Sequence, residues 1–593
     1  KFNVFSLFRN RHRTTRSSSV NVPCDYSRIM DSMKLPVKVQ DWSLILLMAV
    51  GASCGLIYEY LVAHYAGRIL GSVDTVIYGM IGVMIVAMGI GAFLSRWVAC
   101  PFTGFAWLEG IIALLGGVAV LVMAMFYAIA FVLPAQLQSA FGLHESIGIE
   151  GGPAFVLRNL ADSLPYLIGL MLGIFIGMEI PFIARIREHI YQQRLLHNTG
   201  TVYGADYIGA GFGAAVWVLV CLQFPVLYSA ILTAMVNLIL GSIFLALYFP
   251  KIAKAPWLLL FNGVIAVVLV TLFFRGELWM NALNNVMYQD KVVWSDQSQY
   301  QNIVITQKRL GSKGFVTKLH IDGHLQFSSA DEKIYHGMLV QPAYLAANRF
   351  EKVLVVGGGD GLAVRDALQM GAQSVDLIDL DGNMVKLFKG EDAEAPEQLS
   401  QQLVDLNGNA LNNERVNIRI GDAFKVVETL VSEQLWFDAI LVDLPDPHHP
   451  DLNKLYSDYF YQRLQDLLVA DGALVVQATS PYHSKPAFLS ILNTLESVGF
   501  QVDPMHANVP SFGEWGWALA TKSGAGGQIR IQRNSKETAN MALSREFVLS
   551  SFYFPGDFFK GKTGVAINRL NSPTAYRYHS KSWLEEDGLF TFE

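Results

Sequence analysis

The sequence predicts a bundle of about seven transmembrane α-helices, fused to a small antiparallel β domain and an α/β, Rossmann-like nucleotide-binding domain. Three observations lead to this prediction. Apolar residues make up 52% of the 593 residues and are concentrated before residue 275. Segments that alternate apolar and polar residues follow from Lys291 to Phe327, as in antiparallel hairpins. From Glu351 onward, apolar strands alternate with helical segments, which is typical of a doubly wound sheet.

Changes in composition divide the chain into five predicted parts, because a chain of this length exceeds a single core. Residues 276–290 connect the apolar half to the rest, and the first 40 residues lack the apolar stretch of a cleavable signal peptide. The parts are a basic N-terminal tail (1–40), a transmembrane domain (41–275), a β-hairpin domain (285–345), an α/β domain (346–530) and a C-terminal extension (531–593).

Composition also excludes several classes of function. The net charge is −6 and no basic stripe is present, so nucleic acid is not an expected partner. The four cysteines show neither metal-ligand spacing nor a disulfide framework. No GxxxxGK[ST] phosphate loop occurs, which argues against a P-loop nucleotide hydrolase. A charged fraction of only 16% favours contact with a lipid bilayer.

Each predicted membrane span has close to the roughly 20 helical residues that cross a bilayer. Within them, Gly169, Gly173 and Gly177 recur at four-residue spacing, as do Gly209 and Gly213, which favours close helix packing. The spans are 42–64, 74–95, 106–134, 163–184, 204–222, 224–249 and 257–274.

Three acidic residues, Glu59, Glu179 and Asp206, lie in or near these spans. Carboxylates are costly in a membrane and usually face a cavity or a partner. One interpretation is a polar path or a polyamine-sensing pocket. The other places them near helix ends, or paired with His64 or Arg68, and we prefer it for Glu59 and Glu179.

The segment VLVVGGGDG at 353–361 is a strand that runs into a glycine turn and then a helix. Glycine lets the backbone approach a ligand closely, so Gly357 and Gly359 are predicted to border a nucleotide. Asp379 ends the next strand, where a ribose-binding carboxylate belongs. Asp422 ends a further strand, and its carboxylate either meets an adenine amino group or caps the helix that follows.

Asp443 and Asp446 follow a buried strand, on a turn that Pro445 and Pro447 stiffen. Two carboxylates held in this way bind a cation, and one of them can accept a proton. Because ligands bind beyond the carboxyl ends of parallel strands, this pair is expected to share a crevice with the glycine turn. Further polar groups for this site are Gln326, Tyr335 and His336.

Residues 291 to about 523 resemble the polyamine aminopropyltransferases, the spermidine synthase family. The matching segments occur in the order of the family, and the DLPDP form, the FGEWGW segment and the apolar helices resemble its membrane-integrated branch. The segments are SQYQNIVI, IDGHLQFSSADEKIYHGML, VLVVGGGDG, VDLIDLD, GDAF, ILVDLPDPHHP, LYSDYFYQRL, ALVVQATSPY and VPSFGEWGWALA.

The resemblance implies a role for each matching residue. Asp443 would be the proton acceptor, and His336, Asp360 and Asp446 would hold an amine such as putrescine. No permanently bound cofactor and no metal are implied: the co-substrate would be decarboxylated S-adenosylmethionine and the product methylthioadenosine. The residues implied for the nucleoside are Gln301, Asp379, Asp422, Ala423 and Pro450.

The chain departs from the family pattern at three positions. Gly337 stands where the family usually has glutamate, which bears on amine specificity. Asp379 replaces a longer glutamate, and Leu444 replaces a small residue after the catalytic aspartate. Asp443 itself is retained, so we expect an active enzyme.

Two other functions fit parts of the sequence. An S-adenosylmethionine-dependent methyltransferase would have a similar nucleotide-binding half. A polyamine sensor or transporter would work through the acidic residues of the helices. The acidic DLPDP pair and the β segments before the sheet favour the aminopropyltransferase, and a homo-oligomer is expected because family members often form dimers or tetramers.

The membrane topology contains a conflict. The tail, the 185–194 loop and the 251–254 loop are all basic, so the positive-inside rule puts them in the cytoplasm. Seven crossings would then leave the C-terminal half on the far side, although the nucleotide is made in the cytoplasm. We expect a multi-pass cell-membrane protein and favour a cytoplasmic catalytic domain, with the side left open. A missed crossing would lie in 135–162.

Overall fold

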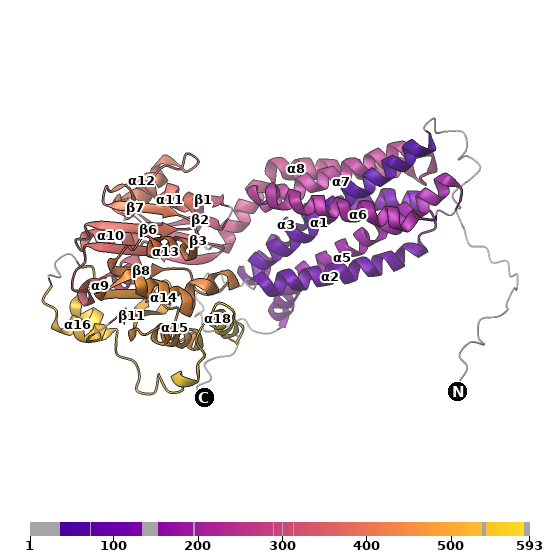
Figure 1. The fold of residues 1–593 in the computed structure, drawn as a ribbon. Helices are drawn as coiled ribbons and strands as arrows, with labels where there is room; N and C mark the ends of the chain where they lie inside the picture. The colour runs from indigo at the N-terminus through magenta and orange to yellow at the C-terminus, as the bar shows by residue number, and fades with distance from the viewer. Residues whose placement is uncertain are drawn as a thin grey trace, which may run out of the picture.

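The computed structural model describes residues 36–70, 73–132, 152–193, 196–288, 290–298, 300–311, 314–522, 524–536 and 541–585. A helical bundle and a part that contains both β-sheets lie end to end (Figure 1). Most of the predicted N-terminal tail, and residues 135–151 of the stretch where an eighth crossing was considered, lie outside the described residues.

Seven helices of the described residues are long and apolar enough to cross a membrane, which agrees with the predicted number. Several run beyond their apolar windows, and α8 continues through most of the predicted connector. The helices are α1 (Val37–Leu70), α2 (Val73–Leu94), α3 (Pro101–Tyr127), α5 (Gly152–Tyr191), α6 (Asn198–Leu219), α7 (Val226–Tyr248) and α8 (Ala255–Met287).

Glycines allow these helices to pack closely, as predicted. A β-carbon added at Gly213 would lie only 2.5 Å from the carbonyl oxygen of Ser53, so α6 contacts the backbone of α1 there. Gly173 brings α5 against α2 in the same way, with the carbonyl oxygen of Met84 at 2.8 Å. These glycines therefore serve helix packing.

The acidic residues of the bundle are placed differently from the prediction. Glu59 lies inside α1 and Glu179 inside α5, and both are buried, so the preferred placement near helix ends is wrong. The helices extend further than the apolar windows from which their ends were judged. Glu109 of α3, which was not among the predicted residues, is also buried and accepts a 2.7 Å hydrogen bond from Asn237 Nδ2 of α7.

One end of the bundle, here called the basic end, holds described residues of two basic segments, 185–194 and 251–254. Arg187 near the end of α5 forms a 2.6 Å ion pair with Asp41 at the start of α1. Lys251, after α7, lies over the ring of Phe102 at the start of α3. Because α8 begins beside Lys251 and ends next to β1, the basic end faces away from the two sheets. Cys100, at the same end, is disulfide-bonded, which the cysteine spacing did not predict.

A four-stranded antiparallel sheet follows the bundle, where the alternating pattern predicted hairpins. Its order is β1-β2-β3-β4, and helix α9 (Glu332–Ala346) follows it at the predicted position. The strands are β1 (Lys291–Gln297), β2 (Asn302–Arg309), β3 (Phe315–Ile321) and β4 (His324–Ser328).

The second sheet has seven strands in the order β10-β11-β9-β8-β5-β6-β7. The five strands from β9 to β7 are parallel, as the doubly wound pattern predicted, and β11 and β10 extend the sheet antiparallel. The strands are β5 (Lys352–Gly357), β6 (Ser374–Asp379), β7 (Val416–Ile420), β8 (Phe437–Asp443), β9 (Leu468–Gln477), β10 (Gln501–Val509) and β11 (Gly513–Thr521).

Helices cover both faces of this sheet, so its central strands are apolar on both sides. Along β5, Val353 and Val355 belong to the core beneath α9, whereas Leu354 and Val356 belong to the core on the opposite face. This alternation is the period of two that a strand imposes. The helices of the α/β part are α10 (Leu362–Gln369), α11 (Gly382–Lys389), α12 (Glu397–Leu406), α13 (Ala423–Ser432), α14 (Asp458–Leu467) and α15 (Lys485–Ser497).

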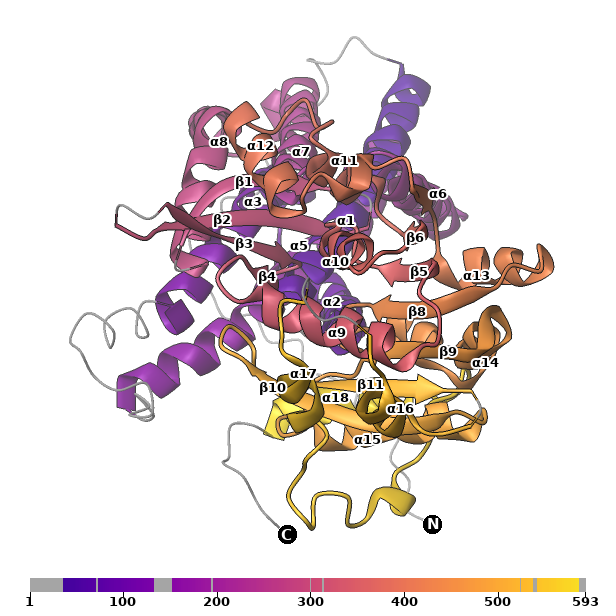
Figure 2. The same cartoon turned by 90° about the vertical axis from the view of Figure 1, so that its left-hand side faces the viewer.

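The C-terminal segment covers the β10–β11 side of the sheet (Figure 2). Its helices are α16 (Gly527–Arg533), α17 (Arg545–Ser550) and α18 (Thr574–Glu585). Helix α16 packs against α9 and β10, and α18 packs against α15 and the 3₁₀ helix η7 (Pro450–Tyr456). The segment thus returns to the elements that follow the Asp443–Pro450 turn.

Candidate active site

The predicted acidic residues meet at the carboxyl ends of the parallel strands. Gly357 of β5 pairs with Asp443 of β8, which places the glycine turn beside the second motif. A β-carbon added at Gly358 would lie 2.9 Å from Asp443 Oδ2, and one added at Gly359 would lie 2.7 Å from Asp379 Oδ2. The two carboxylates therefore border adjacent residues of one turn, at the crevice that the strand ends predict.

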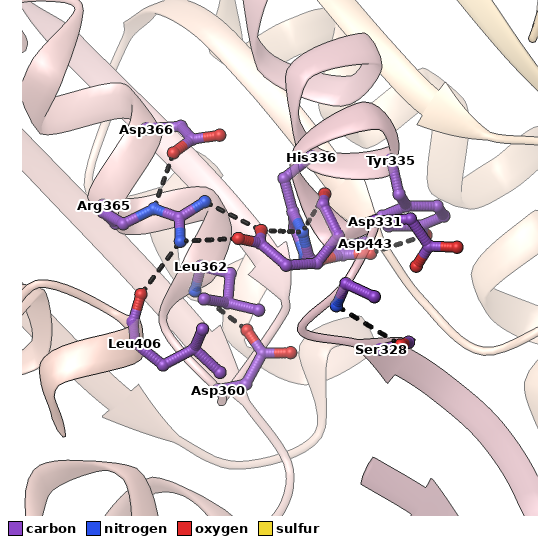
Figure 3. Close-up of polar contacts among 12 residues, drawn as sticks. Ser328, Asp331, Tyr335, His336, Asp360, Leu362, Arg365, Asp366, Leu406 and Asp443 are labelled. Atoms are coloured by element: carbon purple, nitrogen blue, oxygen red, sulfur yellow. Dashed lines mark hydrogen bonds and ion pairs between the residues drawn. The ribbon is translucent and has the colours of Figure 1, made fainter. Parts of the chain in front are cut away.

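Asp443 is held by two residues of α9 (Figure 3). Tyr335 donates a 2.8 Å hydrogen bond to Asp443 Oδ1, and His336 Nε2 lies 3.8 Å from Oδ2. Burial raises the pKa of Asp443, while the charge of His336 and the hydrogen bond from Tyr335 partly oppose that rise. A carboxylate in this position is a stronger base than one in water, which suits it to accept a proton.

His336 is held in place by an ion pair with Glu332, which lies one helical turn earlier on α9. The two side chains form a 3.2 Å ion pair, and Arg365 of α10 donates bonds of 3.0 and 2.8 Å to the same carboxylate. Burial alone would lower the pKa of His336, but the Glu332 bond and the charges of Asp360 and Asp443 raise it to about 9. His336 is therefore a cation at neutral pH.

Neither Glu332 nor Arg365 was predicted to belong to the site. Arg365 also donates to Asp366 and to the carbonyl oxygen of Leu406, which fixes its orientation (Figure 3). The four-residue spacing of Glu332 and His336 on a helix was the signal available in the sequence, because residues at that spacing are neighbours.

Asp360 completes the charged group beside the turn. Its Oδ1 accepts a 2.9 Å bond from the backbone nitrogen of Leu362 at the start of α10. Burial raises the pKa of Asp360 to about 6, with the nearby Asp443 adding to the rise and His336 opposing it. Two buried carboxylates and one imidazolium thus share this space, which favours a cationic ligand.

On the side predicted to bind the nucleotide, Asp379 accepts a 2.8 Å bond from the backbone nitrogen of Asp381. Burial raises the pKa of Asp379 to about 7. Asp422 caps α13, since its side chain accepts from the backbone nitrogen of Phe424, and it also forms a 2.7 Å ion pair with Lys454 of η7. The helix-capping alternative for Asp422 is thus confirmed, and a carboxylate with these two partners can still accept further bonds.

Asp446 lies at the other end of the Asp443–Pro450 turn. Its oxygens accept bonds from Gln477 Nε2 at 3.0 Å, Thr479 Oγ1 at 3.1 Å and His579 Nε2 at 3.2 Å. Burial would raise the pKa of Asp446, but the bond from His579 and the other nearby donors and charges lower it instead. Asp446 is therefore an anion, and its partner His579 comes from a segment to which the sequence assigned no role.

The remaining predicted residues lie around this centre. Ala423 is the first residue of α13 and Pro450 the first of η7, so both follow strand ends. Gln301 closes a turn with Ser298 through its backbone, and Gln326 donates to the carbonyl oxygen of His324 on its own strand. The ligand roles predicted for these residues stay predictions.

Comparison with known proteins identifies the family. The model of the spermine/spermidine synthase domain matches residues 332–532. A polyamine aminopropyltransferase of Shewanella oneidensis is 47% identical over 93% of this chain and 96% of its own length. The chain belongs to the polyamine aminopropyltransferase family. A second polyamine aminopropyltransferase, from Oceanobacillus iheyensis, is 34% identical over 79% of this chain and 84% of its own length.

Among solved structures, spermidine synthase from Thermotoga maritima matches with a TM-score of 0.38 and 22% identity, over 46% of this chain and 87% of its own length. That similarity is too distant to add to the assignment. The relatives confirm the resemblance that the motifs indicated, and the chain is an enzyme that transfers aminopropyl groups. The methyltransferase and the sensor or transporter are correspondingly not favoured.

Proposed function

We propose that the chain transfers the aminopropyl group of decarboxylated S-adenosylmethionine to an amine such as putrescine, giving spermidine and methylthioadenosine. The observation that carries this proposal is the pairing of Asp443 with Tyr335 and His336, beside a glycine turn that Asp379 borders. The donor carries a sulfonium and an ammonium, and the acceptor carries ammonium groups. A site lined with carboxylates fits cationic substrates of this kind.

In the proposed reaction, Asp443 is the base that removes a proton from the acceptor amine. Alkyl amines are mostly protonated near neutral pH, so the acceptor nitrogen must lose a proton before its lone pair can attack. Asp443 accepts that proton first, and the freed lone pair of the nitrogen then forms a bond to the carbon next to the sulfonium. The carbon–sulfur bond breaks and its electron pair returns to sulfur, which leaves a neutral thioether. The sulfonium is a good leaving group and needs no acid.

Positioning of the two substrates falls to the other residues. Asp379 would accept bonds from the ribose, and Gly357 and Gly359 would let the nucleoside approach the backbone. On the amine side, Asp360, His336 and Asp446 would hold the acceptor in line, with Tyr335 orienting the base. The further residues proposed for the nucleoside are Gln301, Asp422, Ala423 and Pro450, and Gln326 is proposed for the amine.

We propose further that the helical bundle, residues 41–275, anchors the enzyme in the cell membrane. Large apolar side chains are exposed along these helices, for example Trp42, Phe93, Phe212 and Phe274. Lipid would cover such a surface. The parts at 285–345 and 346–530 then form the catalytic domain, and 531–593 its C-terminal extension. The assembly proposed is a homo-oligomer, with no permanently bound cofactor.

Replacement of Asp443 by asparagine tests the proposed reaction. The Asp443→Asn variant keeps the shape of the side chain but cannot accept the proton, so turnover should fall by about 10²–10⁴-fold, the usual contribution of a positioned base. Equilibrium binding of decarboxylated S-adenosylmethionine should not change. Asp451→Asn, at an exposed carboxylate on η7, is the matched control. Full turnover by Asp443→Asn, or a methylated product found by mass spectrometry, would refute the proposal.

A further inference from the structure

Helix α18 reaches the amine side of the site from the C-terminal extension. His579 Nε2 lies 3.2 Å from Asp446 Oδ2, and its side chain is 6% exposed. We propose that the C-terminal extension is part of the amine-binding site, and that His579 is a residue that positions Asp446. This inference rests on the proposed function, because it assigns an added residue to the carboxylate that would hold the amine.

The extension is tied by reciprocal hydrogen bonds to η7, the 3₁₀ helix that follows the Asp443–Pro450 turn, here called the catalytic turn. Asn568 Nδ2 donates to the carbonyl oxygen of Asn453 in η7, and Asn453 Nδ2 donates to the carbonyl oxygen of Arg569. Asn568 Oδ1 accepts from the backbone nitrogen of Ala575, at the start of α18. Both asparagines are buried, so these bonds are shielded from water. The bonds fix α18, and with it His579, relative to η7.

Tyr456, also of η7, donates a 2.8 Å bond to the carbonyl oxygen of Pro445 in the catalytic turn. Lys454 of the same short helix pairs with Asp422 on the nucleotide side. The 3₁₀ helix η7 therefore connects the Asp443–Pro450 turn, the nucleotide side and the C-terminal extension.

The extension also contacts α9, the helix that carries Tyr335 and His336. Leu543, which precedes α17, packs on Gly337 of α9, where a β-carbon would lie 2.9 Å from Leu543 Cγ. The backbone nitrogen of Leu543 donates to Gln341 Oε1 of the same helix. Gly337 is the position at which the family usually has a glutamate. The extension thus occupies space that a side chain at position 337 would otherwise take.

The chemistry of His579 suits a positioning role. An imidazole that donates Nε2–H to Asp446 fixes the orientation of that carboxylate, which can still accept bonds from an ammonium group. Gln477 at the end of β9 and Thr479 in the loop that follows also donate to Asp446. Removal of His579 would let Asp446 rotate, which weakens amine binding without touching the nucleotide.

The test measures KM separately for putrescine and for decarboxylated S-adenosylmethionine. In His579→Leu, the KM for putrescine should rise about tenfold or more, the loss expected for a hydrogen bond to a charged group. The KM for the nucleotide should stay within about twofold. His579→Gln keeps an N–H donor at the same reach and should restore most of the putrescine affinity. Tyr578→Phe removes a hydrogen bond of the same helix to the backbone of Ala566 and should change neither KM.

A double-mutant cycle shows whether His579 acts through Asp446. In an Asp446→Asn background, His579→Leu should add little further increase in the KM for putrescine, because the two residues form one unit. Full additivity, an unchanged putrescine KM in His579→Leu, or an equal rise of both KM values would overturn the inference. If the unaltered enzyme transfers no aminopropyl group to putrescine or other amines, the proposed function is wrong. If it does transfer the group but the His579 variants behave as just described, only the inference about His579 is wrong.

Discussion

Burial alone would favour the neutral form of Asp443, and neighbouring residues work against it. His336 carries the positive charge that does so, and Glu332 keeps the proton on His336. Glu332 is 1% exposed and its pKa is lowered to about 2, because His336 and Arg365 outweigh the effect of burial. Three buried charged side chains, Arg365, Glu332 and His336, therefore form successive ion pairs that lead to Asp443.

This chain of ion pairs predicts a shift in the pH dependence of turnover. In Glu332→Gln, His336 loses one of the partners that raise its pKa to about 9, so its pKa should fall and its positive charge should decrease in an assay near pH 8. As that charge decreases, the pKa of Asp443 rises further, and the acid limb of the kcat profile should move to higher pH. Measured kcat values between pH 5 and 9 test this.

His336→Gln removes the charge directly and should move the acid limb in the same direction. Glu351→Gln, on the surface, should leave it in place. An acid limb in Glu332→Gln that coincides with that of the unaltered enzyme would refute the link.

Glu332→Gln should also destabilise the fold by roughly 3–5 kcal/mol, the usual cost of breaking a buried ion pair. The lowered pKa of Glu332 contributes stability that is present above its ordinary value of 4.5 and is lost as pH falls towards 2. The difference in melting temperature between Glu332→Gln and the unaltered enzyme should therefore be large at pH 7 and shrink in acid.

At the scale of elements, the β5–α10 turn lies between the proposed nucleotide side of the site and the proposed base. Gly359 lies against Asp379, and Gly358, with a φ of +70°, lies against Asp443. An added methyl group would therefore disturb the nucleotide side at one position and the catalytic side at the next.

Alanine at these two neighbouring glycines should give opposite kinetic results. Gly359→Ala should raise the KM for the nucleotide by about tenfold, the scale of moderate overpacking, with a smaller effect on kcat. Gly358→Ala should mainly lower kcat, because its methyl group displaces the base and its φ is unfavourable for alanine. Gly382→Ala, where the nearest atom is 3.6 Å away, is the control. Equal effects of both substitutions on both parameters would contradict this division.

The sequence predicted the elements whose pattern is local. The parallel strands appeared as apolar runs, and the turn at 357–361 as consecutive glycines, because each follows from burial or from backbone freedom. Contacts between distant segments left no such pattern: His579 is 133 residues from Asp446, and a lone histidine in an aromatic segment does not indicate its partner. The prediction placed Glu59 and Glu179 near helix ends because it judged the ends from the apolar windows. Helices α1 and α5 continue beyond those windows through less apolar turns.

At the scale of the molecule, the basic end and the catalytic domain lie at opposite ends of the seven apolar helices of the described residues, so a membrane that these helices cross would separate them. The positive-inside rule favours the basic end in the cytoplasm. The nucleotide is made in the cytoplasm, which favours the catalytic domain there. The disulfide bond of Cys100 at the basic end favours the orientation with the basic end outside the cell, because disulfides persist in oxidising compartments outside the cytoplasm.

We therefore predict that the basic end faces outward and the catalytic domain faces the cytoplasm. Single cysteines placed at Lys254 of the basic end and at the exposed Glu397 of the catalytic domain report the two sides. In intact cells, a membrane-impermeant thiol reagent should label the cysteine at 254, whereas the cysteine at 397 should be labelled only after lysis. The reverse pattern would show that the arginines and lysines determine the orientation, and the catalytic domain would then need nucleotide on the far side of the membrane. Labelling of both positions in intact cells would contradict a bundle that crosses the membrane an odd number of times.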